Sequence, residues 1–186
     1  MRKVIYALNV SLDGFIEDVH GGLGWSVPDK ELHEHFNNRD RSYDLFLYGR
    51  RLYETMAAFW PTAEEIPDAP AYVLDYARIW KNKPKVVFSR TLDQVDWNSR
   101  LVRENIADEV NKLKSQPGGE MCVAGAEIAS VFSQLGLIDE YQLYIHPVIL
   151  GGGKPMFGPL EDKIDLQLVE THTFGSGVVL LRYQCA

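Results

Sequence analysis

The sequence predicts an α/β fold in which strand–helix units come first and antiparallel strands come last. Two apolar runs, residues 43–48 and 120–124, each end in a turn that leads directly into a helical pattern. Near the end of the chain, residues 166–173 and 178–184 flank a glycine-containing turn and are typical of a hairpin. A length of 186 residues fits one domain with a sizeable core, so we expect a single domain over residues 1–186.

The chain begins with an almost continuously apolar stretch over residues 3–10, as expected for a strand that is covered on both faces. A turn and a glycine-rich loop over 21–25 follow it. Pro28 then marks the start of a helix over 29–38. Three residues at i, i+3 and i+4 form the inward stripe of this helix, and they are Leu32, His35 and Phe36.

The middle of the chain repeats the strand–helix alternation. The strand over 43–48 leads into a helix over 50–58, which ends before a proline-containing loop that reaches residue 70. A short helix over 71–80 and a buried strand over 85–91 come next.

A small strand over 101–102 precedes an amphipathic helix over 105–115, and the strand over 120–124 leads into a helix that ends at Gly136. The core-facing residues of the helix over 105–115 are Ile106, Val110 and Leu113.

The last part of the chain is predicted to contain antiparallel strands. Residues 140–150 read as a strand, and Pro147 predicts an edge position or a bulge because proline cannot donate to a strand ladder. A glycine-rich loop over 151–155 follows, with Met156-Phe157 as its anchor.

Composition and charge exclude several classes of partner. The formal charge is −7, the isoelectric point is about 5.2, and apolar residues make up 46% of the chain. A nucleic-acid or anionic-membrane surface needs a basic face, so neither is an expected partner. No apolar run reaches membrane-spanning length. The two cysteines, Cys122 and Cys185, suit a reducing compartment, and we expect a cytoplasmic protein.

Three predicted strands end in residues that are suited to an anion. Gly49-Arg50-Arg51 lies at a helix start, where unpaired N–H groups and the helix dipole attract phosphate. Ser89-Arg90 ends another strand, and the small pair Gly125-Ala126 lets a ligand approach the backbone. Because ligands of open α/β sheets gather at the carboxyl ends of strands, we expect a clamp for a phosphorylated cofactor. Solvated surface arginines and tight strand–helix packing are the alternative explanations.

Five short motifs extend over nearly the whole chain: Ser11-Leu12-Asp13-Gly14-Phe15-Ile16, Gly49-Arg50-Arg51-Leu52-Tyr53-Glu54, Val87-Phe88-Ser89-Arg90-Thr91, Val123-Ala124-Gly125-Ala126-Glu127 and Pro147-Val148-Ile149-Leu150-Gly151-Gly152-Gly153-Lys154-Pro155-Met156-Phe157. In this order they resemble the dihydrofolate reductase-like superfamily. Within it the chain is most similar to the reductase domain of riboflavin biosynthesis, which is the C-terminal domain of the bifunctional deaminase-reductase, and to its stand-alone relatives.

The resemblance implies a three-layer αβα fold with a mixed, mainly parallel sheet and an antiparallel C-terminal hairpin. It also implies NADPH as the hydride donor, with Ser89 and Arg90 at the 2′-phosphate and Ala7 and Ile16 beside the nicotinamide. The cofactor-binding residues that it implies are Ala7, Asp13, Ile16, Gly49, Arg50, Arg51, Leu52, Ser89, Arg90, Gly125, Ala126 and Glu127.

The sequence departs from the family pattern at two kinds of position. Leu52 stands where relatives usually have threonine, so one hydroxyl contact to phosphate is lost. Dihydrofolate reductases place a carboxylate on the first helix, two residues after the proline, where this chain has Lys30. We therefore predict Asp29 or Glu31, which flank Lys30, as the catalytic carboxylate. The alternative is that both are solvated acids that favour the helix dipole.

Taken together, these features predict an NADPH-dependent reductase of a small pyrimidine or pterin-type molecule, which resembles 5-amino-6-(5-phosphoribosylamino)uracil reductase. Dihydrofolate reductase activity and a nucleotide-binding module without turnover remain open. A homodimer subunit also remains open, since the last hairpin could supply an apolar face. No metal site is expected, because His33 and His35 are two apart on a helix and point to different sides.

Overall fold

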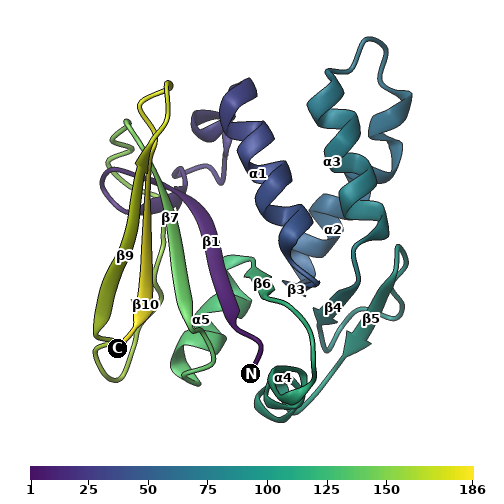
Figure 1. Ribbon diagram of the computed structural model, residues 1–186, viewed down its shortest axis with the longest axis vertical. Coiled ribbons are helices and arrows are strands. Elements are labelled where there is room, and N and C mark those ends of the chain that lie inside the picture. Colours follow the sequence, from purple (N-terminus) through teal and green to yellow (C-terminus); the bar gives the residue numbers. More distant parts are fainter.

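A central eight-stranded sheet organises the fold in the computed structural model, which describes residues 1–186 (Figure 1). The strand order is β5-β4-β3-β6-β1-β7-β10-β9. Its strands are β1 (Val4–Ser11), β3 (Leu45–Gly49), β4 (Lys85–Phe88), β5 (Ser99–Val102), β6 (Met121–Ala124), β7 (Glu140–His146), β9 (Leu166–Thr173) and β10 (Val179–Cys185). A separate two-stranded ribbon pairs β2 (Phe15–Glu17) with β8 (Lys154–Pro155).

The sheet is mixed, with the parallel strands first in the chain and the antiparallel strands last. Strands β5, β4, β3, β6, β1 and β7 pair in parallel, whereas β10 pairs antiparallel with both β7 and β9. This arrangement confirms the predicted mainly parallel sheet with an antiparallel C-terminal hairpin.

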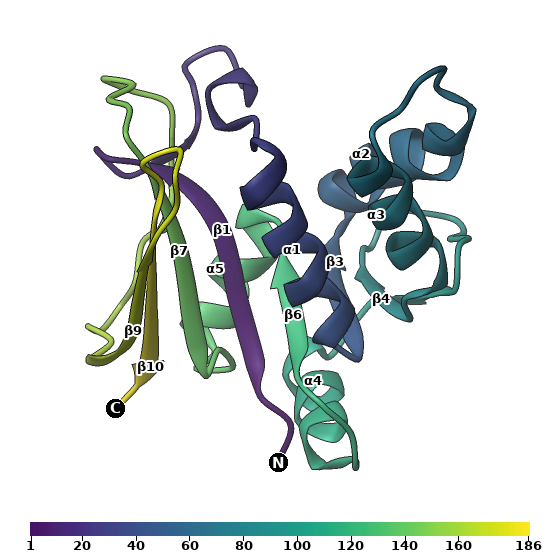
Figure 2. The ribbon, with the colours of Figure 1, turned by 45° about the horizontal axis from the view of Figure 1, so that its top comes forward.

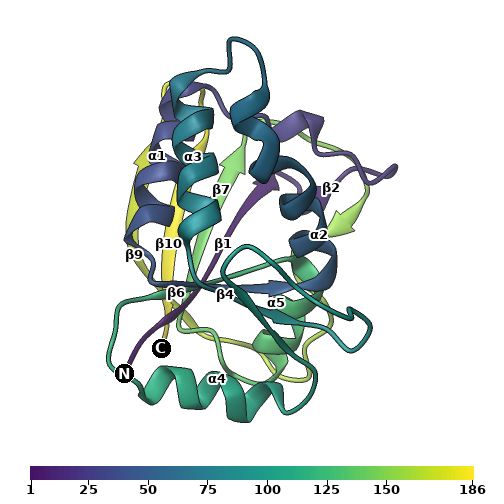
Figure 3. The ribbon, with the colours of Figure 1, turned by 90° about the vertical axis from the view of Figure 1, so that its right-hand side faces the viewer.

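Helices cover both faces of the sheet and complete three layers. On one face lie α1 (Lys30–Ser42), α2 (Arg50–Phe59) and α3 (Ala71–Asn82), and on the other lie α4 (Ile106–Ser115) and α5 (Ala126–Gln134). Figure 2 shows α1 in front of β1 and β6 with α5 behind them, and Figure 3 shows α1 and α3 side by side. Two short 3₁₀ helices, η1 (Gly24–Ser26) and η2 (Trp60–Glu65), lie in the connections.

Alternating residues of the inner strands fill two separate cores. Val4 and Tyr6 of β1 pack with residues of α4 and α5, while Ile5 packs with aromatic residues of α2 and α3. Side chains of a strand point alternately to opposite faces, so a strand between two helix layers must be apolar throughout. This requirement explains the continuous apolar run at the start of the sequence.

Helix α1 is one turn longer than its sequence pattern predicts, because its last turn is held by polar contacts. Asn37 is 2% exposed and donates to the Tyr72 carbonyl oxygen and to Asp75. Asp40 is 5% exposed and accepts from the Tyr76 hydroxyl. These polar residues resemble a helix end in the sequence, yet they are the contacts between α1 and α3.

The prediction that Pro147 marks an edge strand or a bulge is wrong. Strand β7 lies inside the sheet, between β1 and β10, and ends at His146. Pro147 follows the last paired residue, so its missing N–H removes no ladder hydrogen bond.

None of the helices combines the length and the apolar character that crossing a membrane requires, and the longest, α1, has 13 residues.

A buried carboxylate ties the hairpin to the rest of the sheet. Glu140 of β7 is fully buried, and its Oε1 accepts from Arg182 Nε at 3.0 Å and from Gln142 Nε2 at 2.8 Å. Burial alone would raise the pKa of Glu140, but the hydrogen bonds from Arg182 and Gln142 hold it below its usual value. The pair therefore stabilises β7 against β10 as long as both charges are present.

Replacing Arg182 with methionine should lower the free energy of unfolding by about 3 kcal/mol, because the buried Glu140 carboxylate loses its nearer charge partner and keeps only Lys3 at 3.9 Å. Urea denaturation of the two proteins measures the difference. Adding Glu140→Gln to the Arg182→Met variant should recover part of the loss. A double variant that is less stable than Arg182→Met alone would contradict this explanation.

Candidate active site

The structure brings the three predicted anion-binding turns together at one edge of the sheet. Strand β3 lies between β4 and β6, and all three run parallel, so their carboxyl ends are neighbours. From the start of α2, Arg50 Nη1 donates to Thr91 Oγ1 at 3.2 Å, beside the end of β4. Arg51 Nη1 donates to Glu127 Oε1 at 3.1 Å, at the start of α5. The two arginines therefore extend from the central turn to the turns on either side.

Glycine is required where α2 and α5 approach each other. Gly125 has a φ of +103°, a region that residues with a side chain rarely adopt, and an added Cβ would lie 3.4 Å from Leu52 Cβ. An added Cβ on Gly49 would lie 3.3 Å from Ile128. Leu52 thus packs against the neighbouring turn, which gives this residue an apolar role in the place of the family's usual threonine.

Arginines gather around the turn after β4. Ser89 Oγ accepts from the amides of Thr91 and Leu92 and so shapes this turn. Arg103, which follows β5, donates to the carbonyl oxygens of Arg90 and Asp93 at 3.4 and 3.2 Å. No carboxylate lies within ion-pair distance of Arg90 or Arg103, whereas other surface arginines, such as Arg100, have one. Sequence reasoning missed Arg103, because only the pairing of β4 with β5 brings it to this turn.

Glu127 lies in a surface chain of charges at the start of α5. Its carboxylate faces Arg51 and also Lys154 of β8 at 3.7 Å, and Lys154 lies 3.8 Å from Glu17 of β2. The hydrogen bond from Arg51 lowers the pKa of Glu127. The Arg51 and Glu127 side chains are both 67% exposed, so the pair can separate at little cost in free energy.

Asp13 fixes the two loops that flank the ribbon of β2 and β8. Its Oδ1 accepts from Ser11 Oγ at 2.6 Å and from the Leu150 amide at 3.1 Å, and its Oδ2 accepts from the Gly151 amide at 2.7 Å. These bonds, the one from Ser11 foremost, lower the pKa of Asp13. The residue therefore shapes the loop after β1, and its contact with a cofactor stays a prediction.

The two residues predicted to flank the nicotinamide pack against different cores. Ala7 of β1 packs on the core beneath α2 and α3, and Ile16 of β2 packs on the core beneath α5. Their shared contact with the cofactor ring stays a prediction.

Replacing Gly153 with alanine should disrupt the loops that Asp13 holds, because the added Cβ would lie 2.0 Å from the Glu17 carbonyl oxygen at a φ of +137°. We expect proteolytic cleavage around residues 149–153 to be faster in this variant than in the unchanged protein. Gly24→Ala is the matched control, since nothing lies within 4 Å of an added Cβ there. If Gly153→Ala and Gly24→Ala are cleaved at the same rate, the close approach of Gly153 to the Glu17 carbonyl oxygen does not hold these loops in place.

A pocket of about 520 Å³ lies between α1, α3 and the segment from α2 to η2, above the end of β1. Its walls are mainly aromatic and aliphatic, and its polar groups come from β1, α1 and α3. The lining residues are Asn9, Val27, Pro28, His33, Phe36, Arg39, Asp40, Met56, Phe59, Trp60, Tyr72, Val73 and Tyr76. Asn9 lies two residues beyond Ala7 on β1, and Met56 lies on the helix that begins with Arg50, so the pocket adjoins the clamp.

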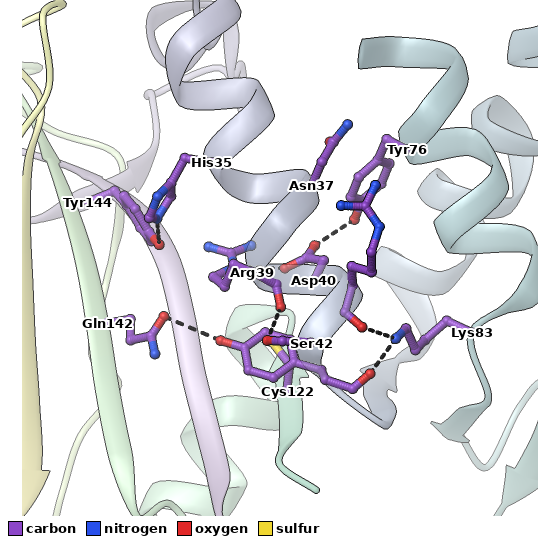
Figure 4. Close-up of polar contacts among 12 residues, drawn as sticks. His35, Asn37, Arg39, Asp40, Ser42, Tyr76, Lys83, Cys122, Gln142 and Tyr144 are labelled. Carbon is purple, nitrogen blue, oxygen red and sulfur yellow. Dashed lines mark hydrogen bonds and ion pairs between the residues drawn. The ribbon is translucent and has the colours of Figure 1, made fainter. Parts of the chain in front are cut away.

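The charged end of the pocket is an ion pair (Figure 4). Arg39 Nε lies 2.7 Å from Asp40 Oδ1, and Asp40 Oδ2 accepts from the Tyr76 hydroxyl at 3.0 Å. The Arg39 guanidinium also lies over the rings of Phe36 and Tyr144, at 4.8 and 5.3 Å from their centres. Both charges are thus compensated before any ligand arrives.

His33 is fixed in one tautomer at the pocket wall. The side-chain amide nitrogen of Asn37 donates to two acceptors, so its oxygen faces His33 Nδ1 at 3.1 Å. An amide oxygen only accepts, so Nδ1 carries the proton and Nε2 is left without a partner in the protein. The ring packs against Tyr72 with a centre-to-centre distance of 4.7 Å.

The two predicted catalytic carboxylates lie outside this pocket. Asp29 accepts from the Leu32 amide and caps α1, and Glu31 accepts from the Gly175 amide at the turn of the β9–β10 hairpin. The structure gives each carboxylate a structural contact, and their catalytic role stays a prediction. Sequence reasoning missed the pocket residues His33, Arg39 and Asp40, because their positions on α1 become meaningful only when α3 packs beside them.

A sheet of this order, with helix starts at the carboxyl ends of three parallel strands, defines a dihydrofolate reductase-like domain. Dihydrofolate reductase from Enterococcus faecalis, complexed with NADP(H), superposes with a TM-score of 0.63 at 9% identity, over 98% of this chain and 96% of that one. The model of the family "RibD C-terminal domain" matches residues 2–180. The chain therefore belongs to this family, as its motifs predict.

Other similar proteins agree with this assignment. The chain is 39% identical to the uncharacterized protein YyaP of Bacillus subtilis (strain 168), over 98% of this chain and 94% of that protein. A putative riboflavin biosynthesis protein from Shewanella sp. PV-4 has a TM-score of 0.78 at 24% identity, with 99% of both chains covered. The deaminase/5-amino-6-(5-phosphoribosylamino)uracil reductase of Thermotoga maritima has a TM-score of 0.68 at 15% identity, and this chain covers 57% of it. At these identities the solved structures share the fold.

Proposed function

We propose that the protein is an NADPH-dependent reductase of a small planar heterocycle of the pyrimidine or pterin type. The observation that carries the proposal is the meeting of three anion-binding turns, at the ends of β3, β4 and β6, next to an aromatic-walled pocket. A binding module without turnover would need the clamp but not a pocket of about 520 Å³ beside it. Family membership and the likeness to a dihydrofolate reductase complexed with NADP(H) support the same function.

The residues present fit a dinucleotide phosphate. The amides at the starts of α2 and α5 and the guanidiniums of Arg50 and Arg51 would hold the pyrophosphate. Arg90 and Arg103, which have no carboxylate partner, would hold the 2′-phosphate together with Ser89. When bound, the cofactor supplies the hydride.

Within the pocket, the chain's own groups orient the substrate and supply the proton. The aromatic walls exclude water and hold a flat ring between them. His33 carries a proton on Nδ1 toward Asn37, so in its imidazolium form the Nε2–H is the bond that can donate to the substrate. Donation from His33 would replace the carboxylate that dihydrofolate reductases use on this helix.

Replacing Arg90 and Arg103 together with alanine should weaken NADPH binding about tenfold or more and leave NADH binding unchanged, because charge-assisted hydrogen bonds to the 2′-phosphate are lost. Fluorescence titration with the two cofactors measures the dissociation constant for NADH divided by that for NADPH, which should fall about tenfold. The double variant Ser89→Ala/Arg90→Ala should lower the same ratio. Arg100→Ala is the control, since Arg100 pairs with Glu109 instead. An unchanged NADPH-to-NADH preference in both double variants would refute the 2′-phosphate site.

Replacing His33 with glutamine should lower kcat by about 100-fold or more, because the substrate loses its proton donor. The assay follows NADPH oxidation with dihydrofolate and with 5-amino-6-(5-phosphoribosylamino)uracil. His35→Gln is the matched control, because His35 lies on the same helix but bonds to the Tyr144 hydroxyl.

The tautomer is tested without any substrate. A long-range ¹H–¹⁵N spectrum of the free protein, recorded with the imidazole rings neutral, should show His33 protonated on Nδ1. Protonation on Nε2 would contradict the role of Asn37.

A further inference from the structure

We propose that the molecule reduced in this pocket is an uncharged planar heterocycle without a phosphate or carboxylate tail. This inference rests on the proposed reductase function and narrows its substrate class. It also separates this chain from the related reductase of Thermotoga maritima, whose name specifies a phosphoribosyl substrate.

Apart from the His33 ring, whose proton the reaction consumes, the interior of the pocket has no cation available for an anionic substrate. Among its 13 lining residues the only permanently charged side chains are Arg39 and Asp40, which pair with each other at 2.7 Å. Asp40 is 5% exposed, so the carboxylate stays beside the guanidinium and cannot turn into solvent. A phosphate that entered here would meet Arg39 only together with Asp40, and the repulsion would offset the attraction.

The segments around the pocket also lack a free cation. Residues 13–29, which lead into α1, and residues 52–77, which supply the opposite wall, contain no lysine or arginine. They contain nine carboxylates: Asp13, Glu17, Asp18, Asp29, Glu54, Glu64, Glu65, Asp68 and Asp75. Neither segment therefore offers a free cation to a substrate tail that extends out of the pocket.

The basic residues of α1 and α3 that lie nearest to these segments have carboxylates beside them. Lys30 lies 3.9 Å from Glu34, Arg41 lies 2.7 Å from Asp75, and Arg78 and Lys81 lie 3.2 and 2.6 Å from Glu64. By contrast, the unpaired arginines Arg90 and Arg103 lie at the cofactor turn. The chain thus separates the two tasks: it presents its free guanidiniums to the cofactor and a neutral, aromatic surface to the substrate.

An uncharged ring fits the aromatic and hydrogen-bonding groups that line the pocket. The rings of Trp60, Tyr72 and Tyr76 line the pocket and offer apolar contacts to a flat ring, and Asn9, His33 and the N–H groups of Arg39 offer hydrogen bonds to ring carbonyl and nitrogen atoms. Such bonds require no net charge on the substrate.

Two pairs of probes that differ only in their tails test the inference. One is 5-amino-6-(ribosylamino)uracil with its 5′-phosphate, and the other is 6-methyl-7,8-dihydropterin with dihydrofolate. Calorimetric titration into protein saturated with NADP⁺ measures each dissociation constant. We expect the uncharged member of each pair to bind at least tenfold more tightly. Tighter binding of the phosphate- or carboxylate-bearing members, or no saturation by either uncharged probe at millimolar concentration, would overturn the proposal.

A designed cation provides the converse test. Val27 lines the pocket and is 75% exposed, so Val27→Arg should fold normally and strengthen binding of the phosphorylated probe about threefold to tenfold relative to the uncharged probe. Leu135→Arg, at the exposed end of α5, is the control and should change neither. No gain for the phosphorylated probe in Val27→Arg would also count against the proposal.

The substrate class and the reductase function can fail separately in these experiments. Binding of NADP⁺ is measured first, and its absence would refute the proposed function. If NADP⁺ does not bind, the paired probes are titrated into the protein without cofactor, and the ratio of their dissociation constants alone decides whether the pocket rejects anionic tails.

Discussion

The parallel pairing of β3 with β4 on one side and β6 on the other is the constraint on which the site depends. Because the three strands run in the same direction, their carboxyl ends and the starts of the two following helices meet at one edge. The side chains that make this edge chemically useful come from distant parts of the sequence. Arg50 and Arg51 connect them, each with one hydrogen bond to a neighbouring turn. A different strand order would leave the same residues as unrelated surface groups.

The site also needs a wall for the pocket, and helix α1 supplies it. Its inward stripe is held by polar groups as much as by apolar ones: Asn37 and Asp40 are nearly buried and bond to α3. Buried polar networks are costly unless they are fully satisfied, but they fix geometry. Here the same contacts that fix α1 against α3 also set the His33 tautomer and pair Arg39 with Asp40. Packing and pocket chemistry therefore rely on the same residues.

The sequence predicted the features that depend on local pattern. The apolar runs of β1, β3 and β6 and the Gly49-Arg50-Arg51 turn indicated the layers and the anion-binding edge, because strand periodicity and helix-start chemistry are local properties. The pocket could not be predicted in the same way. His33 and Asp40 look like ordinary surface residues of a helix until α3 packs beside them, and Arg103 reaches its turn only through the β4–β5 pairing. Pro147 was misjudged for a similar reason, since its effect depends on where the ladder ends, and no local signal shows this.

The central claim is that three strand ends form one dinucleotide site. Amide chemical-shift mapping of the ¹⁵N-labelled protein with NADP⁺ tests this claim most directly, because it reports each turn separately. We expect saturable shifts with one dissociation constant at Gly49–Leu52, Ser89–Leu92 and Gly125–Glu127, and none along β9, which is the last strand on the opposite side of the sheet. Shifts at only one of the three turns, different dissociation constants among them, or no shifts at all would contradict it.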